Sequence, residues 1–91
     1  MFYVYVLQSE KDQGLYIGYT TDLKGRLSQH QAGEARATVA RYPFELIYYE
    51  AYLMEEDATG RERFLKSGSG RKYLDKQLKH HFAAYPRRET A

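Results

Sequence analysis

Hydrophobic side chains in this chain gather in short segments separated by polar or glycine-containing stretches. Residues 2–7 and 15–20 are rich in aromatic and β-branched side chains, which is typical of strands. Because the polar run 9–14 between them ends in glycine, we expect the two strands to form a hairpin. Residues 44–52 predict a third strand, and their apolar content indicates a central position or burial on both faces.

Three other segments show the spacing of apolar residues that is typical of helices. Residues 23–31 predict a first helix, and residues 54–66 predict a second with three acids in its first turn, where the helix dipole favours them. Ser69 is expected to cap a third helix at residues 71–82. Residues 83–91 are expected to form a frayed basic tail. The predicted order of elements is ββαβαα.

Length and composition limit the classes of protein to which the chain can belong. Its 91 residues and 43% hydrophobic content suit one domain near the lower end of what folds alone. Cysteine is absent, which excludes disulfides and cysteine-based metal clusters and suits a reducing compartment. No apolar run approaches the ~20 residues of a membrane span, and the N-terminus does not resemble a signal peptide. We therefore expect a cytoplasmic protein with no membrane partner.

Charge is unevenly distributed along the chain, although the net charge is only +2. Residues 1–65 contain 7 Lys and Arg against 10 Asp and Glu, whereas residues 66–91 contain 7 against 2. A basic segment of this kind suits binding to a phosphate backbone, and it is equally typical of an ordinary solvated helix face. The charge pattern alone does not decide between a nucleic-acid-binding surface and a solvated helix face.

Two short tyrosine motifs stand out in the predicted hairpin: Tyr3-Val4-Tyr5 and Tyr16-Ile17-Gly18. Because side chains alternate along a strand, Tyr5 and Tyr16 share a face only if the numbers of paired residues have an odd sum. A register that pairs Ser9 with Gly14 meets this condition. Two phenols would then stand together beside Gly18, which would leave backbone open to a close ligand. The alternative is that these tyrosines are ordinary half-buried sheet residues.

Arg26 and His30 lie four positions apart in the first predicted helix, so they project together from a face beside its leucines. Both could then point toward the edge of the sheet. The alternative is a surface arginine and a histidine that the helix dipole favours near the C-terminus. In the loop that follows, Arg36 and Arg41 are either available to phosphate or simply solvated.

Glu62 falls on the apolar face of the second predicted helix, together with Ala58 and Leu65. A carboxylate on such a face is costly unless it is paired or bound to a metal. Two interpretations follow. Glu62 is a metal ligand, or it pairs with a neighbouring arginine or lies at the margin of the apolar face.

The order and spacing of these residues resemble the GIY-YIG nuclease superfamily, and most closely its small stand-alone bacterial branch, the YhbQ-like proteins. The resemblance runs from Phe2 to about Leu78. The first tyrosine motif stands where the family has its first motif, and the second reproduces the YIG motif letter for letter. The helix with Glu62 resembles the one that carries the family's metal-ligand glutamate. The ordered set that makes the resemblance specific consists of Tyr5, Tyr16, Gly18, Arg26, His30 and Glu62.

The resemblance implies a role for each residue of this set. Glu62 would hold one Mg²⁺ or Mn²⁺ ion, weakly bound until nucleic acid completes the site. Tyr5 or Tyr16 would orient or deprotonate the attacking water. Arg26 would bind the scissile phosphate, and His30 would tune a tyrosine or take part in proton transfer.

The resemblance also implies a fold and an activity. The fold is an α+β sandwich in which helices flank a three-stranded antiparallel sheet, within residues 1–82. The activity is metal-dependent hydrolysis of nucleic-acid phosphodiesters, with DNA as the expected substrate, selected by structure or strand more than by sequence. Specificity would come from the domain's own surface or from a protein partner. Contacts to nucleic acid are expected from Gly18, Arg36, Arg41, Lys66, Arg71 and Lys72.

Two features depart from the family pattern. Tyr3 replaces the glycine that opens the first motif, and the chain contains no asparagine, whereas many active members carry one after the metal-binding helix. One polar contact of the site is therefore unfilled. Two further hypotheses stay open: a nucleic-acid-binding module of the same fold with little or no turnover, and a protein-interaction domain whose tyrosines are only core residues.

Overall fold

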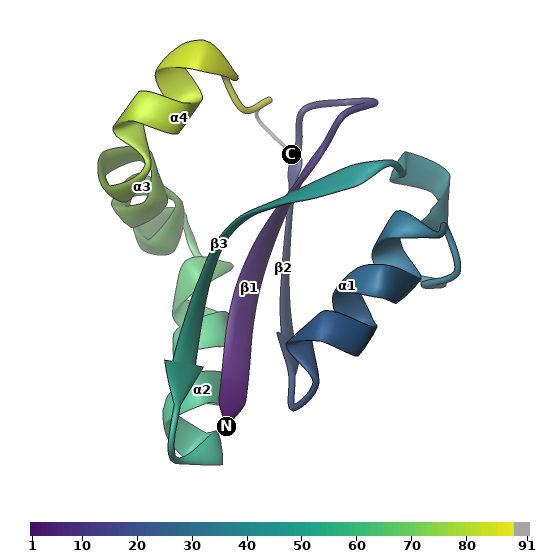
Figure 1. Cartoon of the computed structure of the whole chain (residues 1–91). Coiled ribbons are helices and arrows are strands. Elements are labelled where there is room, and N and C mark those ends of the chain that lie inside the picture. The colour runs from purple at the N-terminus through teal and green to yellow at the C-terminus, as the bar shows by residue number, and fades with distance from the viewer. Residues whose placement is uncertain (89–91) are drawn as a thin grey trace.

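One antiparallel sheet forms the middle of the molecule, and helices lie against both of its faces (Figure 1). The computed structural model describes residues 1–88. In chain order the elements are β1 (Phe2–Ser9), β2 (Leu15–Thr20), α1 (Leu23–Gln31), the 3₁₀ helix η1 (Val39–Arg41), β3 (Phe44–Tyr52), α2 (Glu55–Leu65), α3 (Gly68–Gln77) and α4 (Lys79–Ala84). The predicted α+β class and three-stranded antiparallel sheet are confirmed, as are the predicted bounds of β2, α1 and β3.

β1 is the central strand, because the sheet runs in the order β2-β1-β3. The prediction that the third strand is central, or buried on both faces, is wrong. A register shift lies opposite Val6 and Leu7, and around it Ile47 and Tyr48 both pack against the core on the α2 side. Tyr49 on the other face is 52% exposed. The edge strand β3 is therefore apolar because its face toward α2 packs against the core, whereas its opposite face is partly exposed.

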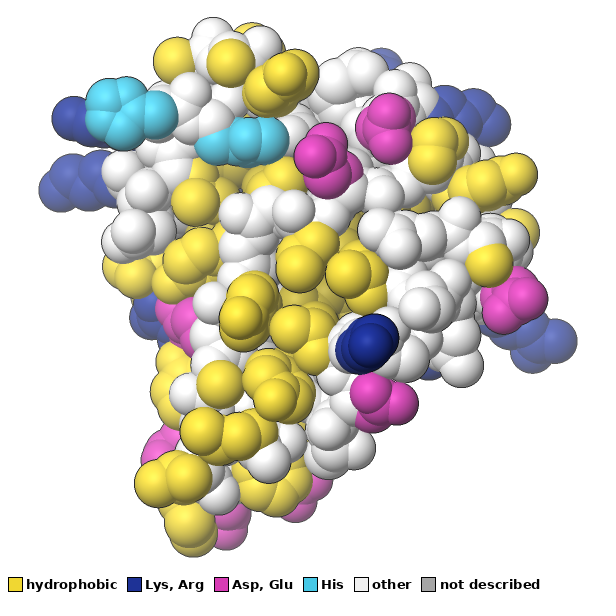
Figure 2. Space-filling model, in the orientation of Figure 1, with side chains coloured by type: hydrophobic (Ala, Val, Ile, Leu, Met, Phe, Trp, Pro, Cys, Tyr) yellow, Lys and Arg dark blue, Asp and Glu magenta, His cyan; other side chains and the backbone are white. Residues whose placement is uncertain are grey.

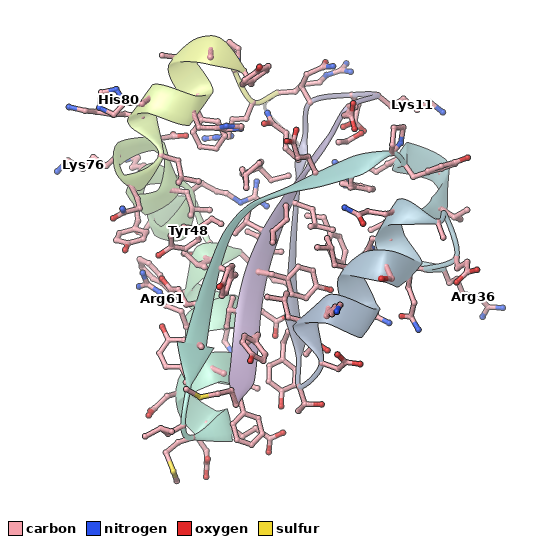
Figure 3. The ribbon with its side chains drawn as sticks, viewed as in Figure 1. Lys11, Arg36, Tyr48, Arg61, Lys76 and His80 are labelled. Carbon is pink, nitrogen blue, oxygen red and sulfur yellow. The ribbon has the colours of Figure 1, made fainter. Side chains whose placement is uncertain are left out.

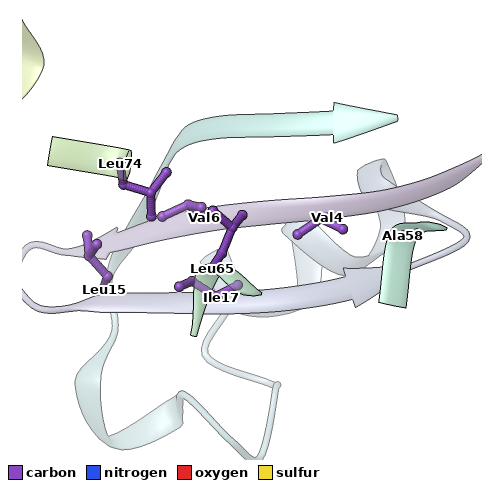
Figure 4. Close-up of a cluster of buried hydrophobic side chains, with 7 residues drawn as sticks. All are labelled: Val4, Val6, Leu15, Ile17, Ala58, Leu65 and Leu74. Atoms are coloured by element: carbon purple, nitrogen blue, oxygen red, sulfur yellow. The ribbon is translucent and has the colours of Figure 1, made fainter. Parts of the chain in front are cut away.

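Alternation along β1 divides the buried side chains between two hydrophobic clusters. The cluster between the sheet and the helices α2 and α3, drawn in Figure 4, consists of Val4, Val6, Leu15, Ile17, Ala58, Leu65 and Leu74. The cluster on the α1 side consists of Tyr5, Leu7 and Phe44, with Tyr16, Leu23, Leu27 and Leu46 packed against it. Tyr5 and Tyr16, one tyrosine from each motif, thus belong to the layer between the sheet and α1.

The junction of α2 and α3 explains why the third helix begins earlier than predicted. The hydroxyl of Ser67, and not that of Ser69, caps this helix and accepts a hydrogen bond from the amide of Gly70 at 3.2 Å. A β-carbon at Gly70 would lie 2.0 Å from the carbonyl oxygen of Phe64, so glycine lets α3 pack directly against the end of α2. Leu78 then separates α3 from α4, so two helices replace the single one that the sequence predicted.

The segment after α4 is held to the domain, which corrects the expectation that it frays from residue 83. Arg87 pairs with Asp75 of α3 at 2.7 Å. Gln8 of β1 donates a hydrogen bond to the carbonyl oxygen of Tyr85 at 3.1 Å. The rest of the predicted tail, residues 89–91, lies outside the described residues.

Candidate active site

Tyr5 of β1 and Tyr16 of β2 lie side by side on the α1 face of the sheet. Tyr5 is paired with Gly18, which is a register with an odd sum, and the amide of Ser9 donates to the carbonyl oxygen of Gly14 at 2.9 Å. The centroids of the two phenol rings are 6.3 Å apart. The predicted juxtaposition of the two phenols is therefore confirmed.

Gly18 makes room for the ring of Tyr5. A β-carbon at this position would lie 2.4 Å from the Tyr5 hydroxyl oxygen, far inside contact distance, and Gly18 is itself buried. The expectation that its backbone lies open to nucleic acid is wrong on this face of the sheet. The glycine is required by the close approach of a neighbouring side chain.

His30 of α1 joins the two phenols in one buried aromatic group. Its Nε2 lies 3.0 Å from the hydroxyl oxygen of Tyr5, and its ring centroid lies 5.3 Å from that of Tyr16. The side chain is fully buried, so the helix dipole alone, which was the alternative interpretation, does not explain its position. Burial and, to a smaller extent, the positive charge of Arg26 lower the pKa of His30, so the imidazole is neutral at neutral pH.

Arg26 lies one helical turn before His30 and places a guanidinium near both phenols. Interaction with Tyr5 is the main reason that the pKa of Arg26 is raised, and Tyr16 adds to it. Burial raises the pKa of Tyr5, and the nearby guanidinium opposes that effect. The guanidinium also donates to the side-chain oxygen of Gln29 at 3.0 Å. A permanent cation thus stands beside the two hydroxyl groups.

Glu62 of α2 supplies a carboxylate to the same surroundings. Its negative charge adds to the larger effect of burial in raising the pKa of Tyr5. The Glu62 side chain is 22% exposed and lies 3.0 Å from the ammonium of Lys66, which is 53% exposed. An exposed pair of this spacing on a helix is worth about 0.5 kcal/mol, so it does not lock the acid. The neighbouring Arg61 binds Glu50 instead, which excludes it as the partner of Glu62.

The single carboxylate of Glu62 suits a metal ion that keeps most of its bound water. No three His, Cys, Asp or Glu side chains gather into a metal-binding group within residues 1–88. Mg²⁺ is commonly held by one or two carboxylates together with waters and the phosphates of a substrate. A single acid in the same surroundings as the guanidinium of Arg26 therefore fits one Mg²⁺ or Mn²⁺ ion that shares its ligands with a phosphate.

Arg41 is a structural clamp, which corrects the expectation that it is available to phosphate. Its guanidinium donates to both carboxylate oxygens of Asp12, at 2.8 and 3.2 Å, and lies 5.5 Å from the centroid of the Phe44 ring. This pairing lowers the pKa of Asp12 to about 2. It ties the loop after α1 to the β1–β2 hairpin. Arg36 in the same loop is exposed and points away from the body of the molecule (Figure 3).

Two basic residues of the C-terminal region, Lys76 and His80, are directed away from the tyrosines (Figure 3). Lys76 and His80 project outward from α3 and α4, on the side of the molecule away from α1 (Figure 3). Figure 2 shows basic and histidine side chains along that margin. Among the predicted nucleic-acid contacts, Lys66 pairs with Glu62. Arg71 is half-buried and Lys72 is exposed. Their contacts with nucleic acid stay predictions.

Thr38 is a residue of the site that the sequence did not reveal. Its Oγ1 lies 2.6 Å from Nδ1 of His30, on the opposite side of the imidazole from Tyr5, and the residue is 1% exposed. It lies in a loop of small residues in which composition does not distinguish one position from the next. Only the fold of this loop over the end of α1 brings it to the histidine.

A second unpredicted group holds α2 in place. Glu50 of β3 accepts two hydrogen bonds from Arg61, at 2.9 and 3.0 Å, and one from each hydroxyl of Tyr48 and Tyr52. Tyr48 and Arg61 come from β3 and α2 at the same margin of the molecule (Figure 3). This network anchors the turn of α2 that carries Glu62 to the sheet.

Comparison with known proteins identifies the family of the chain. The sequence profile of the GIY-YIG catalytic domain matches residues 1–79. A UPF0213 protein of Streptococcus pyogenes serotype M5 is 48% identical over 65 residues, which cover 70% of each chain. A UPF0213 protein of Streptococcus pneumoniae serotype 4 is 45% identical over 65 residues, covering 70% of this chain and 65% of the other. A solution NMR structure of a UPF0213 protein from Bacillus halodurans is 32% identical with a TM-score of 0.45, and it covers 94% of this chain and 86% of that one.

Proposed function

The chain belongs to the GIY-YIG family of nuclease-type hydrolases, and we propose that it is a divalent-metal-dependent endonuclease that hydrolyses phosphodiester bonds in nucleic acid. One observation supports this beyond family membership: two phenols, a guanidinium and an imidazole from three segments are neighbours in the fold, and the charge of a carboxylate from a fourth segment acts on one of the phenols. These groups belong to Tyr5, Tyr16, Arg26, His30 and Glu62. The set offers a candidate for phosphate binding, for water activation and for holding a cation.

Arg26 is the group that would bind the scissile phosphate. A guanidinium is charged at every accessible pH and presents a planar set of donors that matches phosphate oxygens. A fixed donor set of this kind stabilises the negative charge that develops in the transition state. Because Arg26 stands beside Tyr5 and Tyr16, a phosphate bound to it would lie close to both hydroxyl oxygens.

A phenol oxygen is the candidate base, with Tyr5 and Tyr16 as alternatives. An unperturbed phenol has a pKa near ~10, and burial raises the pKa of Tyr5 further, so Tyr5 is protonated at neutral pH in the free protein. The guanidinium of Arg26 acts in the opposite direction, and added positive charge would favour the phenolate. Tyr5 would therefore become an effective base only when the charge of the site becomes more positive.

Glu62 would hold the divalent cation. A bound Mg²⁺ supplies Lewis-acid polarisation of the phosphate and positive charge close to the phenols. Because the site offers a single carboxylate, we expect weak affinity for the cation until a phosphate of the substrate adds further oxygen ligands.

The proposed substrate is DNA that is recognised by its structure or strand. Where the surface of the domain does not provide enough selectivity, a protein partner would provide it. Among the described residues, no helix has the length and apolar character needed to cross a membrane. A cytoplasmic location stays a prediction.

A binding module without turnover is the second candidate function. It is favoured by the complete absence of asparagine from the chain, since many active relatives carry that residue after the metal-binding helix. Such a module would bind the same nucleic acids through Arg26, with affinity that falls steeply as salt concentration rises.

A cleavage assay tests the proposed function and separates the two candidates. Branched, flapped, single-stranded and duplex DNA, and single-stranded RNA, are incubated with the protein in Mg²⁺, in Mn²⁺ and in chelator. The proposal predicts metal-dependent cleavage of at least one structured DNA and its loss in Glu62→Ala. Tight binding without cleavage of any substrate would favour the binding module, and cleavage that Glu62→Ala does not change would point to a contaminating nuclease.

A further inference from the structure

A continuous chain of buried polar contacts runs through His30, from Tyr5 on one side to Thr38 on the other. The Tyr5 oxygen lies 3.0 Å from Nε2, and Thr38 Oγ1 lies 2.6 Å from Nδ1. All three residues are at most 1% exposed. The imidazole is therefore held from both ring nitrogens by hydroxyl groups, and water has little access to it.

The imidazole can donate on only one of these two sides. Burial and the charge of Arg26 keep His30 neutral, and a neutral imidazole carries one N–H and one lone pair. If Thr38 donates to Nδ1, then Nε2 carries the hydrogen and donates to Tyr5. If Thr38 accepts from Nδ1, then Tyr5 donates to Nε2. The two arrangements give His30 opposite roles toward the phenol.

The surroundings of the two hydroxyl groups decide between these arrangements. The Thr38 hydroxyl makes no second hydrogen bond within residues 1–88, so accepting from Nδ1 would leave its own proton buried without a partner. Folded proteins avoid an unpaired buried donor. The Tyr5 hydroxyl instead lies beside the half-buried Tyr16 and beside Arg26. There the hydroxyl oxygen of Tyr16, or a phosphate oxygen bound to Arg26, can accept its proton.

We infer that Thr38 is a positioning residue that donates to Nδ1, holds His30 as its Nε2–H tautomer and thereby makes His30 a hydrogen-bond donor to the Tyr5 oxygen. The catalytic consequence rests on the proposed function, whereas the tautomer is a property of the folded chain. Of the two roles that family resemblance offered for His30, this arrangement selects the tuning of a tyrosine. His30 does not receive the proton of Tyr5, and its N–H stabilises the Tyr5 oxygen when that oxygen carries negative charge.

The loop that carries Thr38 is anchored in a way that suits this task. Its backbone is fixed by the hydrogen bond from the amide of Arg41 to the carbonyl oxygen of Thr38 at 2.9 Å. Arg41 is in turn clamped by Asp12, and its carbonyl oxygen accepts from the hydroxyl of Ser9 at 2.6 Å. Arg41, which the sequence analysis expected to contact nucleic acid, therefore holds Thr38 against His30.

Nitrogen NMR of the imidazole tests the inference without reference to cleavage. Long-range proton–nitrogen spectra of the ¹⁵N-labelled protein are recorded at pH 8, and the His30 signals are assigned by comparison with His30→Gln. We expect a protonated Nε2 and an unprotonated Nδ1 in the wild type and in Thr38→Ser. Thr38→Val should give nitrogen shifts between the two tautomers. A protonated Nδ1 in the wild type, or an unchanged spectrum in Thr38→Val, would overturn the inference.

Cleavage kinetics test the catalytic consequence. Thr38→Val should reduce the cleavage rate about 10- to 100-fold, as is common when a residue that orients a functional side chain is lost. Thr38→Ser keeps the hydroxyl and should keep most of the rate, and equal losses in both variants would contradict a positioning role. If the wild type cleaves no substrate, the proposed function fails, and the NMR result in the wild type still decides the tautomer.

Discussion

A β-carbon at Gly18 would lie 2.4 Å from the hydroxyl oxygen of Tyr5, because the phenol ring crosses from β1 over the paired glycine of β2. Tyr5 is 1% exposed, so its ring is packed on all sides. Gly18→Ala should therefore displace the ring from His30, lower the free energy of unfolding by about 1–3 kcal/mol and reduce cleavage. Urea denaturation and cleavage rates measure the two effects.

Gly60 provides the matched control for this substitution. It lies in α2, and a β-carbon there would meet nothing within 4 Å. Gly60→Ala should leave cleavage unchanged and raise the free energy of unfolding by up to about 1 kcal/mol, as expected for alanine in an exposed helix. If Gly18→Ala behaved like Gly60→Ala, the close approach of Tyr5 would not be the reason for the glycine.

Replacement of Arg26 by Gln should lower the cleavage rate about 100-fold or more, since it removes the charge that stabilises the transition state. The fold should persist, because this side chain is only partly buried. Lys24→Gln changes the same charge on the same helix at an exposed position and should have little effect. Single-turnover cleavage rates at saturating enzyme make the comparison, and similar rates for the two variants would contradict the role given to Arg26.

Asp12→Asn should lower the free energy of unfolding at pH 7 by about 1 kcal/mol, because it removes the charge that binds Arg41 and keeps the acceptor for the amide of Gly14. The pKa of Asp12 is lowered to about 2, so the contribution of the pair is complete above the ordinary carboxyl range near ~4 and is lost as the pH falls toward 2. Urea denaturation of both proteins between pH 7 and pH 2 should show the difference shrinking. A difference that grew in acid would show that the ion pair is not its cause.

His30 should make stability fall in mild acid. Its pKa is lowered below the ordinary ~6.5, so below that pH the unfolded state binds a proton that the folded state refuses. The contribution is complete above pH 6.5, and the loss can reach about 1.4 kcal/mol per pH unit below it. Urea denaturation at pH 7.5 and 5.5 should show a larger loss in the wild type than in His30→Gln. Equal losses would mean that the folded protein admits a charged imidazole.

Local patterns were sufficient to predict the hairpin and the position of the two phenols. Strand parity links Tyr5 and Tyr16, and a polar turn ending in Gly14 restricts the register, so the pairing follows from residues close in the chain. The bounds of α1 were also local, because the side chain of Asp22 caps its first turn. The proximity of Glu62 and Arg26 to these phenols came from family resemblance and could not be derived from spacing alone.

The predictions that failed depended on contacts between segments distant in sequence. Arg41 looked available because Asp12, its partner, lies 29 positions earlier across the hairpin. Thr38 was overlooked because only the return of its loop over α1 brings it to His30. The third helix began early because Gly70 allows close packing on α2, a requirement that composition does not reveal.

Paramagnetic NMR can establish whether the acid and the phenols serve one metal-dependent site. Relaxation of the ten tyrosine rings is measured as Mn²⁺ is added in the presence of an uncleavable phosphorothioate oligonucleotide. We predict that Tyr5 and Tyr16 are among the most strongly affected rings in the wild type and in Glu56→Gln, an exposed acid of the same helix, and that the effect is largely lost in Glu62→Gln. Equal effects in Glu62→Gln, or effects confined to rings elsewhere in the chain, would contradict a site in which Glu62 holds the cation beside the two phenols.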